Sequence, residues 1–525
     1  MAVGTIASRG TGFVRNAAIA AVLGVEGVGG VFNLANTTPN IVYELLLGGI
    51  LTSVLVPVLV RAAKSDADGG EAYAQRLLSL AVIVLTIASV LLVLLAPALV
   101  GLYASPTMTH DERELAITLS RFFLPQMLFY GAGAVMGAIL NTRGRFGPPM
   151  WAPALNNLVV IANCALFLTL PGTTPLSPGT ITDTQILVLG IGTTLGIVAQ
   201  TVALVPSLRS VGFTFRLRTD FRGSGLGKVA HMAKWVLLYV AANQLAYVVV
   251  VRLATQHSIS TAGRGYAAYV NAFVLWQLPH AVVGVSVITA LLPRMSRAAA
   301  DGRLDDMREQ LNRGLRLAAA LLIPAAVAYI VLGRVLATVV FGHLRTSVDQ
   351  AQFIGVLLAV FAVGLVPFSA YQLQLRAFYA LQDTRTPTLI NLWVNATLVA
   401  VDVPLFYALP DRYRVLGLAV GHASSFVVGL VICSRVLSRR LGGLDHAVVV
   451  RTAVRCLTAA ALPAALAALL VAGLLHGLGS GLAGSLAGLA LGGAVFVVGY
   501  AVLARRLRIQ ELDELLGPVL ARLRR

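Results

Sequence analysis

Fourteen stretches of this 525-residue chain are each long and apolar enough to cross a bilayer core, which takes about 20 residues of helix. Charged residues make up only 12% of the chain, about half of what a water-soluble protein carries. The sequence therefore predicts an all-α integral membrane protein. The predicted spans run approximately over residues 2–23, 33–61, 77–103, 115–140, 150–171, 184–208, 229–254, 266–293, 314–341, 350–380, 387–409, 414–437, 448–475 and 482–504.

Lysine and arginine are distributed unevenly between the spans. The loops after even-numbered spans and the C-terminal tail together hold 29, whereas the loops after odd-numbered spans hold about five. Cytoplasmic loops of membrane proteins are enriched in basic residues, so we expect a multi-pass plasma-membrane protein with both termini in the cytoplasm. The net charge of +18 then reflects topology and contact with anionic lipid headgroups, and no nucleic acid partner is expected.

Two proline landmarks recur at nearly the same spacing. Pro57 and Pro293 close similar apolar helix ends, and Pro148 and Pro387 open similar segments. The common shift of about 237 residues predicts two parallel six-helix repeats around a central cleft, plus two extra C-terminal helices. Chance recurrence of helix ends that carry proline and arginine is the alternative. The expected parts are an N-terminal lobe over residues 1–208, a C-terminal lobe over 229–437, two additional spans over 448–504 and a basic cytoplasmic tail over 505–525.

The first two spans carry polar side chains, which a bilayer tolerates only beside a partner or a water-filled cavity. Arg9 and Arg15 lie about 120° apart on span 1 and can line one broad cavity wall. Asn36 and Asn40 belong to a polar stripe on span 2, where a nearby proline predicts a kink or local unwinding. Glu44 is the natural countercharge of the arginines. A bendable helix that presents arginines is suited to an anion, although Arg9 could instead reach the cytoplasm and Glu44 could form a structural ion pair.

The equivalent spans of the second repeat are also polar, with Asn243 and Gln244 in span 7 and Gln277 in span 8. We expect these side chains to face spans 1 and 2 across the cleft. Asp402 in span 11 is either an ion-coupling carboxylate or a residue at the membrane interface. The sequence contains no GxxxxGK[ST] loop, no HExxH motif and no spaced Cys/His cluster, so no enzyme activity, cofactor or metal is expected.

Five segments carry a more specific pattern: SRGTGFVRNAAIAAVLG at 8–24, ANTTPNIVYELLLGGILTSVLVPVLVRA at 35–62, GAILNTRGRF at 137–146, QLPHAVVGVSVITALLPRMSRAA at 277–299 and RAFYALQDTRTP at 376–387. In these segments, and along essentially its whole length, the chain resembles the MurJ/MviN family of lipid II flippases, and in particular its actinobacterial branch. That family belongs to the MOP exporter superfamily. The resemblance implies a transporter that moves undecaprenyl-diphosphate-linked peptidoglycan precursor from the inner to the outer leaflet by alternating access.

The resemblance also implies a substrate site. Arg9 and Arg15 match the cavity arginines implicated in holding the diphosphate, and Asn40 matches an asparagine of span 2. The expected substrate-binding set is Arg9, Arg15, Asn36, Asn40, Tyr43, Glu44 and Gln277. The implied partners are lipid II or a related polyprenyl-diphosphate glycolipid, membrane lipids, and proteins of cell-wall synthesis or division. Spans 13 and 14 match a groove for the lipid tail, although plain helix packing explains their glycines, such as Gly473, Gly488 and Gly492, equally well.

The chain departs from the proteobacterial members at four positions. Gly30 stands where they carry an aspartate, Tyr43 and Val274 where they carry arginines, and Gln277 where they carry a glutamate. The cavity is therefore expected to be less charged. Two alternative functions remain: a MOP-type exporter of another polyprenyl-linked glycan or a drug, and a non-transporting scaffold in cell-wall synthesis. An anionic headgroup predicts dependence on the arginines, whereas a cationic drug predicts dependence on Glu44.

Overall fold

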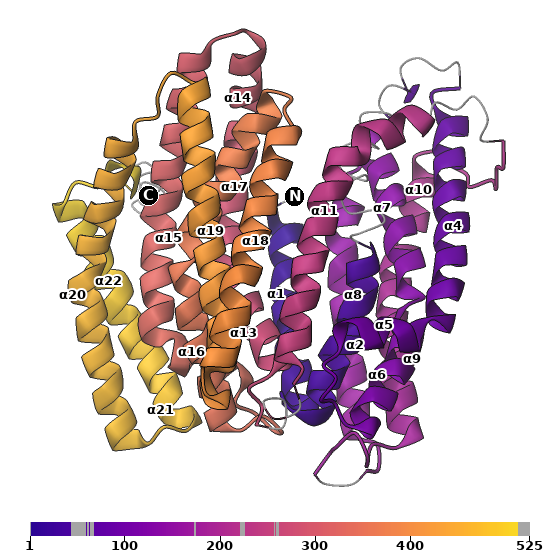
Figure 1. The fold of residues 1–525 in the computed structure, drawn as a ribbon, viewed down its shortest axis with the longest axis horizontal. Coiled ribbons are helices and arrows are strands. Elements are labelled where there is room, and N and C mark those ends of the chain that lie inside the picture. The colour runs from indigo at the N-terminus through magenta and orange to yellow at the C-terminus, as the bar shows by residue number, and fades with distance from the viewer. Residues whose placement is uncertain are drawn as a thin grey trace. The chain divides into compact units, whose positions relative to one another are not determined.

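The computed structural model describes residues 2–43, 59, 62–63, 68–172, 175–220, 226–256, 258 and 262–512. These residues are almost entirely helical, and no strand occurs among them. Their contacts divide the chain into two compact units, Met1–Ala267 (unit 1) and Ala268–Arg525 (unit 2). Figure 1 shows the helices of each unit.

The helices of unit 1 are α1 (Ala2–Leu23), α2 (Gly27–Tyr43), α4 (Glu71–Leu94), α5 (Ala96–Tyr103), α6 (His110–Phe123), α7 (Gln126–Thr142), α8 (Gly147–Leu168), α9 (Asp183–Val202), α10 (Val205–Ser210) and α11 (Leu226–Ala254). Next comes α13 (Tyr266–Pro279), which begins at the boundary between the units. Unit 2 continues with η3 (His280–Gly284), α14 (Val285–Ala300), α15 (Leu304–Phe341), α16 (Val348–Val363), α17 (Leu365–Ala380), α18 (Arg385–Ala408), η4 (Asp411–Tyr413), α19 (Arg414–Arg440), α20 (His446–Leu478), α21 (Leu482–Ala487), η5 (Gly488–Gly492) and α22 (Gly493–Arg506).

The described helices confirm the predicted fold class. Eleven of them are long and apolar enough to cross a membrane, or twelve if α16 and α17, bent by 47° at Gly364, form one span. They coincide with predicted spans 3 to 14. Helix α1 covers predicted span 1 but does not meet the same test, and α2 covers the described beginning of predicted span 2. The total of fourteen therefore stays a prediction.

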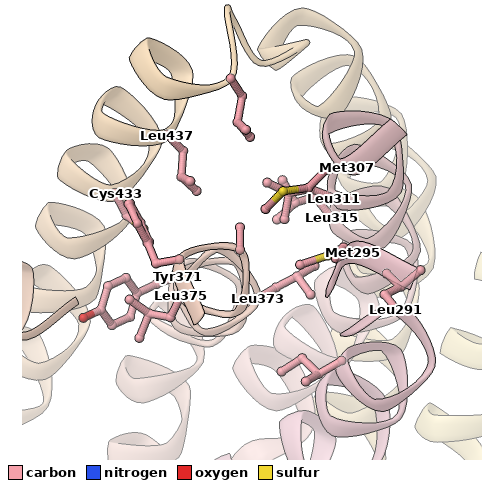
Figure 2. Packing of buried hydrophobic residues seen from close by; sticks show 14 of the residues in the cluster. Leu291, Met295, Met307, Leu311, Leu315, Tyr371, Leu373, Leu375, Cys433 and Leu437 are labelled. Atoms are coloured by element: carbon pink, nitrogen blue, oxygen red, sulfur yellow. The ribbon is translucent and has the colours of Figure 1, made fainter. Parts of the chain in front are cut away.

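Apolar side chains lie both inside and outside each unit, as a protein dissolved in lipid requires. Figure 2 shows a core of unit 2, in which α14, α15, α17 and α19 contribute residues such as Met295, Leu311, Leu373 and Leu437. Leu94 on α4 and Leu469 on α20 are, in contrast, 72% and 71% exposed. Side chains so apolar and so exposed on long helices fit a surface that faces acyl chains.

The two units repeat the same local structures at a constant shift in residue number. A capping box in which Thr109 and Glu112 bond each other's backbone N–H groups begins α6, and Ser347 and Gln350 form the same box at the start of α16. After α7 the chain turns through Gly144 at φ 75°, and after α17 it turns through Gln382 at φ 59°. The shift between the two turns equals the shift between the two boxes. Both turns carry the hydrogen bonds of a Schellman motif.

Helix packing repeats along with these turns. Helices α6, α7 and α8 each contact α9, and their counterparts α16, α17 and α18 each contact α19. Pro148 and Pro387 lie in the first turns of the equivalent helices α8 and α18, whereas Pro57 lies outside the described residues. Unit 1 includes α11, although the predicted second lobe begins at residue 229. The lobes are defined by the repeat rather than by compactness, so their boundaries stay a prediction.

A charged cluster ties the turn between α17 and α18 to the end of α19. The carboxylate of Asp383 accepts hydrogen bonds from the backbone N–H (2.9 Å) and hydroxyl (2.6 Å) of Thr386. Arg440 donates from Nη1 to Asp383 (2.6 Å) and from Nη2 to Thr386 Oγ1 (2.9 Å). Partial burial raises the pKa of Asp383, but the hydrogen bonds from Thr386 and Arg440 outweigh it, so that its pKa lies below the ordinary value.

Asp383→Asn is expected to lower stability at neutral pH by about 1 kcal/mol, since it weakens charge-assisted hydrogen bonds at a half-exposed site. Because the folded pKa is depressed, this contribution is complete above the unfolded pKa of about 3.9 and is lost as the pH falls through the folded pKa. Thermal unfolding at pH 7 and at pH 3 measures both effects. Asp305→Asn, whose side chain is 86% exposed, is the control and should change little. Equal melting temperatures for Asp383→Asn and wild type at pH 7 would contradict this account.

Candidate functional site

Helix α1 is held against α8 by a face of small residues. The Nδ2 of Asn157 on α8 donates to the carbonyl oxygen of Ser8 and to Oγ1 of Thr11, at 3.0 Å each. A Cβ at Gly12 would lie 3.3 Å from the same Nδ2, and a Cβ at Gly4 would press on the ring of Trp151. Glycine thus permits the close approach, and Asn157 fixes the rotation of the helix that carries the two arginines.

Arg15 is partly buried within unit 1. Its Nε and Nη2 donate to Oδ1 of Asn16 at 3.4 and 3.2 Å, and its charge lies close to the phenol of Tyr130 on α7 and the thiol of Cys164 on α8. No carboxylate pairs with it among the described residues. Because a guanidinium has five N–H donors and Asn16 takes only two, Arg15 keeps donors for an anionic ligand.

Arg9 is exposed, as is the neighbouring Gly10, where an added Cβ would meet nothing within 4 Å. No hydrogen bond or ion pair of its guanidinium occurs within the described part of the chain. The two arginines therefore differ in environment, since Arg9 is exposed and Arg15 is partly buried beside residues of α7 and α8. Whether they bind one ligand together stays a prediction.

Helix α2 carries the predicted asparagines in regular geometry. Asn36 is partly buried and Asn40 is exposed, with Nδ2 of Asn40 donating to the carbonyl oxygen of Asn36 at 3.1 Å. The helix runs through Pro39 as far as Tyr43, so the local unwinding expected there does not occur in this stretch. The side chain of Tyr43 and the whole of Glu44 lie outside the described residues, and the proposed pairing of Glu44 stays a prediction.

A hydroxyl network that the sequence analysis missed joins three segments of unit 1. Oγ1 of Thr37 lies 2.7 Å from the hydroxyl of Tyr266, which lies 2.7 Å from that of Tyr247. Thr38 on the same helix bonds to the hydroxyl of Tyr103. The network links α2 to α11 and to the start of α13. In the sequence, only the tyrosines within predicted spans could have indicated this hydroxyl network, because the hydroxyl of a buried tyrosine usually has a hydrogen-bond partner.

Gly30 lines a cavity of about 10 Å³, roughly the space of one water molecule. The side chain of Glu112, only 4% exposed, lines the same cavity together with Thr255 and Tyr266. A Cβ at Gly30 would meet nothing within 4 Å. Position 30 lacks the aspartate of the proteobacterial members, but Glu112 of α6 brings a buried carboxylate to the same cavity.

Gln277 is exposed on α13 in unit 2. The following residues form the π-helix η3, and Nδ1 of His280 lies 2.9 Å from the hydroxyl of Ser369 on α17. Beside Gln277, the buried Trp276 packs against Phe361 and His422 with ring centroids 5.9 and 5.1 Å apart. One face of this part of α13 is therefore locked in an aromatic core, while Gln277 remains accessible.

Asp402 is fully buried against α19, and neither carboxylate oxygen has a hydrogen-bond partner among the described residues. Burial against α19 does not fix its depth in the membrane, so both interpretations of Asp402 stay predictions. The glycines of the last helices also differ from one another. A Cβ at Gly492 would lie 2.7 Å from Val471, and one at Gly473 would meet nothing within 4 Å. Helix packing thus accounts for Gly492 but not for Gly473.

The arrangement of helices is that of a known class of membrane transporter. A solved structure titled lipid II flippase MurJ, inward closed conformation, matches 96% of this chain and 99% of its own with a TM-score of 0.73 at 16% identity. An inward-facing multidrug resistance MATE family transporter of the MOP superfamily matches 82% of this chain and 94% of its own, with a TM-score of 0.66 at 16% identity. At such identities the likeness defines the fold.

Sequence comparison identifies the family. The family model of lipid II flippase MurJ matches residues 19–489. The probable lipid II flippase MurJ of Rhizobium meliloti is 26% identical over 87% of this chain and 83% of its own length. The lipid II flippase MurJ of Burkholderia cenocepacia is 25% identical over 83% of this chain and 81% of its own. The chain belongs to the MurJ family of lipid II flippases, as its sequence motifs indicated.

Proposed function

We propose that this protein moves lipid II from the inner to the outer leaflet of the plasma membrane by alternating access, with both termini in the cytoplasm. Family membership over most of the chain supports a flippase over a drug exporter or a scaffold. The structural observation that carries the proposal is Arg15, a cation seated in a helix of unit 1 without a carboxylate partner among the described residues. A charge in such a place costs at least about 2.5 kcal/mol, which a bound anion would offset.

The diphosphate of lipid II is such an anion. The planar fork of a guanidinium matches two phosphate oxygens at once, which a lysine ammonium cannot do. Arg15 would hold the diphosphate while the exposed Arg9 would attract it from the solvent side. The polar side chains expected to meet the sugar and peptide of the headgroup are Asn36, Asn40, Tyr43, Glu44 and Gln277.

The proposed cycle contains no covalent step. The headgroup would cross within the protein while the polyprenyl tail stays in lipid, and the membrane potential or an ion gradient would supply the energy. Proteins of cell-wall synthesis or division are the expected partners, because they consume the translocated precursor. These assignments follow from the family and from the distribution of basic residues in the loops.

Expression in cells depleted of their own lipid II flippase tests the proposal. Wild type is expected to restore lipid II in the outer leaflet, measured by its accessibility to an external enzyme. Correctly inserted protein that leaves lipid II in the inner leaflet would contradict flippase activity and favour the scaffold. An exporter of cationic drugs would instead confer drug efflux that is lost in Glu44→Gln and kept in Arg15→Ala.

A further inference from the structure

A groove of about 400 Å³ lies on unit 2, and none of the residues expected to bind the substrate lines it. Its lining residues come from α15, α16 and α20. Helix α15 packs against both of the other helices (Figure 1). The residues that line it are Ile330, Val331, Arg334, Gly355, Val356, Ala359 and Ala468. The walls are therefore apolar except for one arginine.

Small residues create this groove. Helices α15 and α16 touch through Gly333 and Gly355, where a Cβ on Gly355 would overlap the carbonyl oxygen of Gly333. Such close approach leaves no side chain to fill the surface above the contact. Ala359 on α16 is partly buried and Ala468 on α20 is exposed, and both are small, so the space beside them stays open. The groove thus arises from the way the helices pack.

Arg334 is exposed and forms no hydrogen bond or ion pair through its guanidinium within the described part of unit 2. It lies seven residues before the end of α15, about 10 Å along the helix. Ala468 lies ten residues before the end of α20, about 15 Å along that helix. By the predicted topology both ends are external, which places the guanidinium near the boundary between acyl chains and headgroups of the outer leaflet.

A cation at this depth needs an anionic partner, and the described protein supplies none. The lipid phosphates lie at the same level, and a guanidinium binds phosphate through two parallel hydrogen bonds. We propose that the groove binds an anionic phospholipid of the outer leaflet, with its phosphate on Arg334 and an acyl chain along Ile330, Val331 and Val356. The leaflet rests on the predicted topology, whereas the binding itself does not depend on transport of lipid II.

Native mass spectrometry of the purified full-length protein with added phosphatidylglycerol tests this site. Wild type is expected to retain one tightly bound phosphatidylglycerol in preference to phosphatidylethanolamine. Arg334→Gln should bind phosphatidylglycerol about fivefold more weakly, the value of one basic residue at an anionic headgroup. Ala468→Phe, which fills the groove from an exposed position, should also weaken binding. Arg412→Gln is the control, because it removes an exposed arginine of the same unit outside the groove and should bind as wild type does.

Three results would overturn the proposal. The first is equal retention of phosphatidylglycerol by wild type and Arg334→Gln, and the second is equal retention of the two phospholipids by wild type. The third is displacement of the bound phosphatidylglycerol by stoichiometric lipid II, which would assign the groove to the substrate. Should Arg334→Gln fail to fold, Ala468→Phe decides, since wild-type binding in that variant would equally exclude the groove. Restoration of flipping in depleted cells is measured separately, so failure of this proposal leaves the flippase proposal standing.

Discussion

Arg15→Ala is expected to lower the rate at which lipid II reaches the outer leaflet by about 10- to 100-fold, because hydrogen bonds to a charged group contribute about 1.5–3 kcal/mol. The side chain keeps three N–H donors beyond those taken by Asn16 and has no carboxylate partner among the described residues. Without Arg15, the diphosphate should lose the more deeply buried of the two arginines expected to bind it. The measurement is the accessibility of lipid II to an external enzyme in flippase-depleted cells.

Two further variants separate charge from geometry. Arg15→Lys keeps the positive charge but not the planar fork, so it should restore only part of the rate. Val14→Ala changes an exposed apolar neighbour on the same helix and should behave as wild type. The melting temperature of Arg15→Ala should equal or exceed that of wild type, since a costly charge is removed from the membrane. Wild-type flipping by Arg15→Ala at equal expression would disprove the role given to Arg15.

Gly355→Ala is expected to have the largest effect on stability. The added Cβ would overlap the carbonyl oxygen of Gly333 and lie 2.5 Å from Cα of Arg334, and these backbone atoms cannot rotate away as a side chain could. Helices α15 and α16 would have to separate, at a cost of about 1–3 kcal/mol for overpacking. The expected result is a lower melting temperature and less folded protein in detergent, measured by thermal unfolding and size-exclusion chromatography.

Gly473→Ala provides the matched control within the same unit. Its Cβ would meet nothing within 4 Å, so the methyl group only replaces a glycine inside α20, five residues before the end of that helix. Alanine favours a helix over glycine by about 1 kcal/mol, and the melting temperature should therefore stay equal or rise. Both variants carry the same chemical change. If Gly355→Ala lowers the melting temperature and Gly473→Ala raises it, the contact between α15 and α16 is the cause of the loss of stability. A fall of similar size in both variants would show that glycine is needed for another reason.

Much of the repeat was available in the sequence. The Thr109–Glu112 and Ser347–Gln350 capping boxes are visible as matching pairs of residue types, separated by nearly the same shift as the proline landmarks. The turn at Gly144 was equally readable, but its partner at Gln382 was not, since glutamine seldom adopts a positive φ. The capping boxes and the turn at Gly144 are decided by local hydrogen bonding. The positive φ of Gln382 depends on the tertiary contacts that hold the turn.

The candidate site could be predicted only in part. The sequence placed Arg9, Arg15 and Asn40 on helices, and the structure has them on α1 and α2, but their role in binding a substrate stays a prediction. It did not predict that Arg15 would lie near Tyr130 and Cys164 or that Glu112 would line the cavity beside Gly30. These neighbours come from other helices, and their approach depends on how each helix is rotated about its axis.

The sequence by itself determined that this is a polytopic membrane protein, the approximate limits of its spans and the family to which it belongs. Hydropathy and charge add up along one helix at a time, so local composition is sufficient for them. Only the tertiary structure decided which polar side chains have partners, where two glycines let helices touch, and that Arg334 stands alone in an apolar groove. Each of these features depends on how two or more helices pack together. The packing angle and the rotation of each helix are set by all the contacts of the folded protein, so they cannot be read from one segment of sequence.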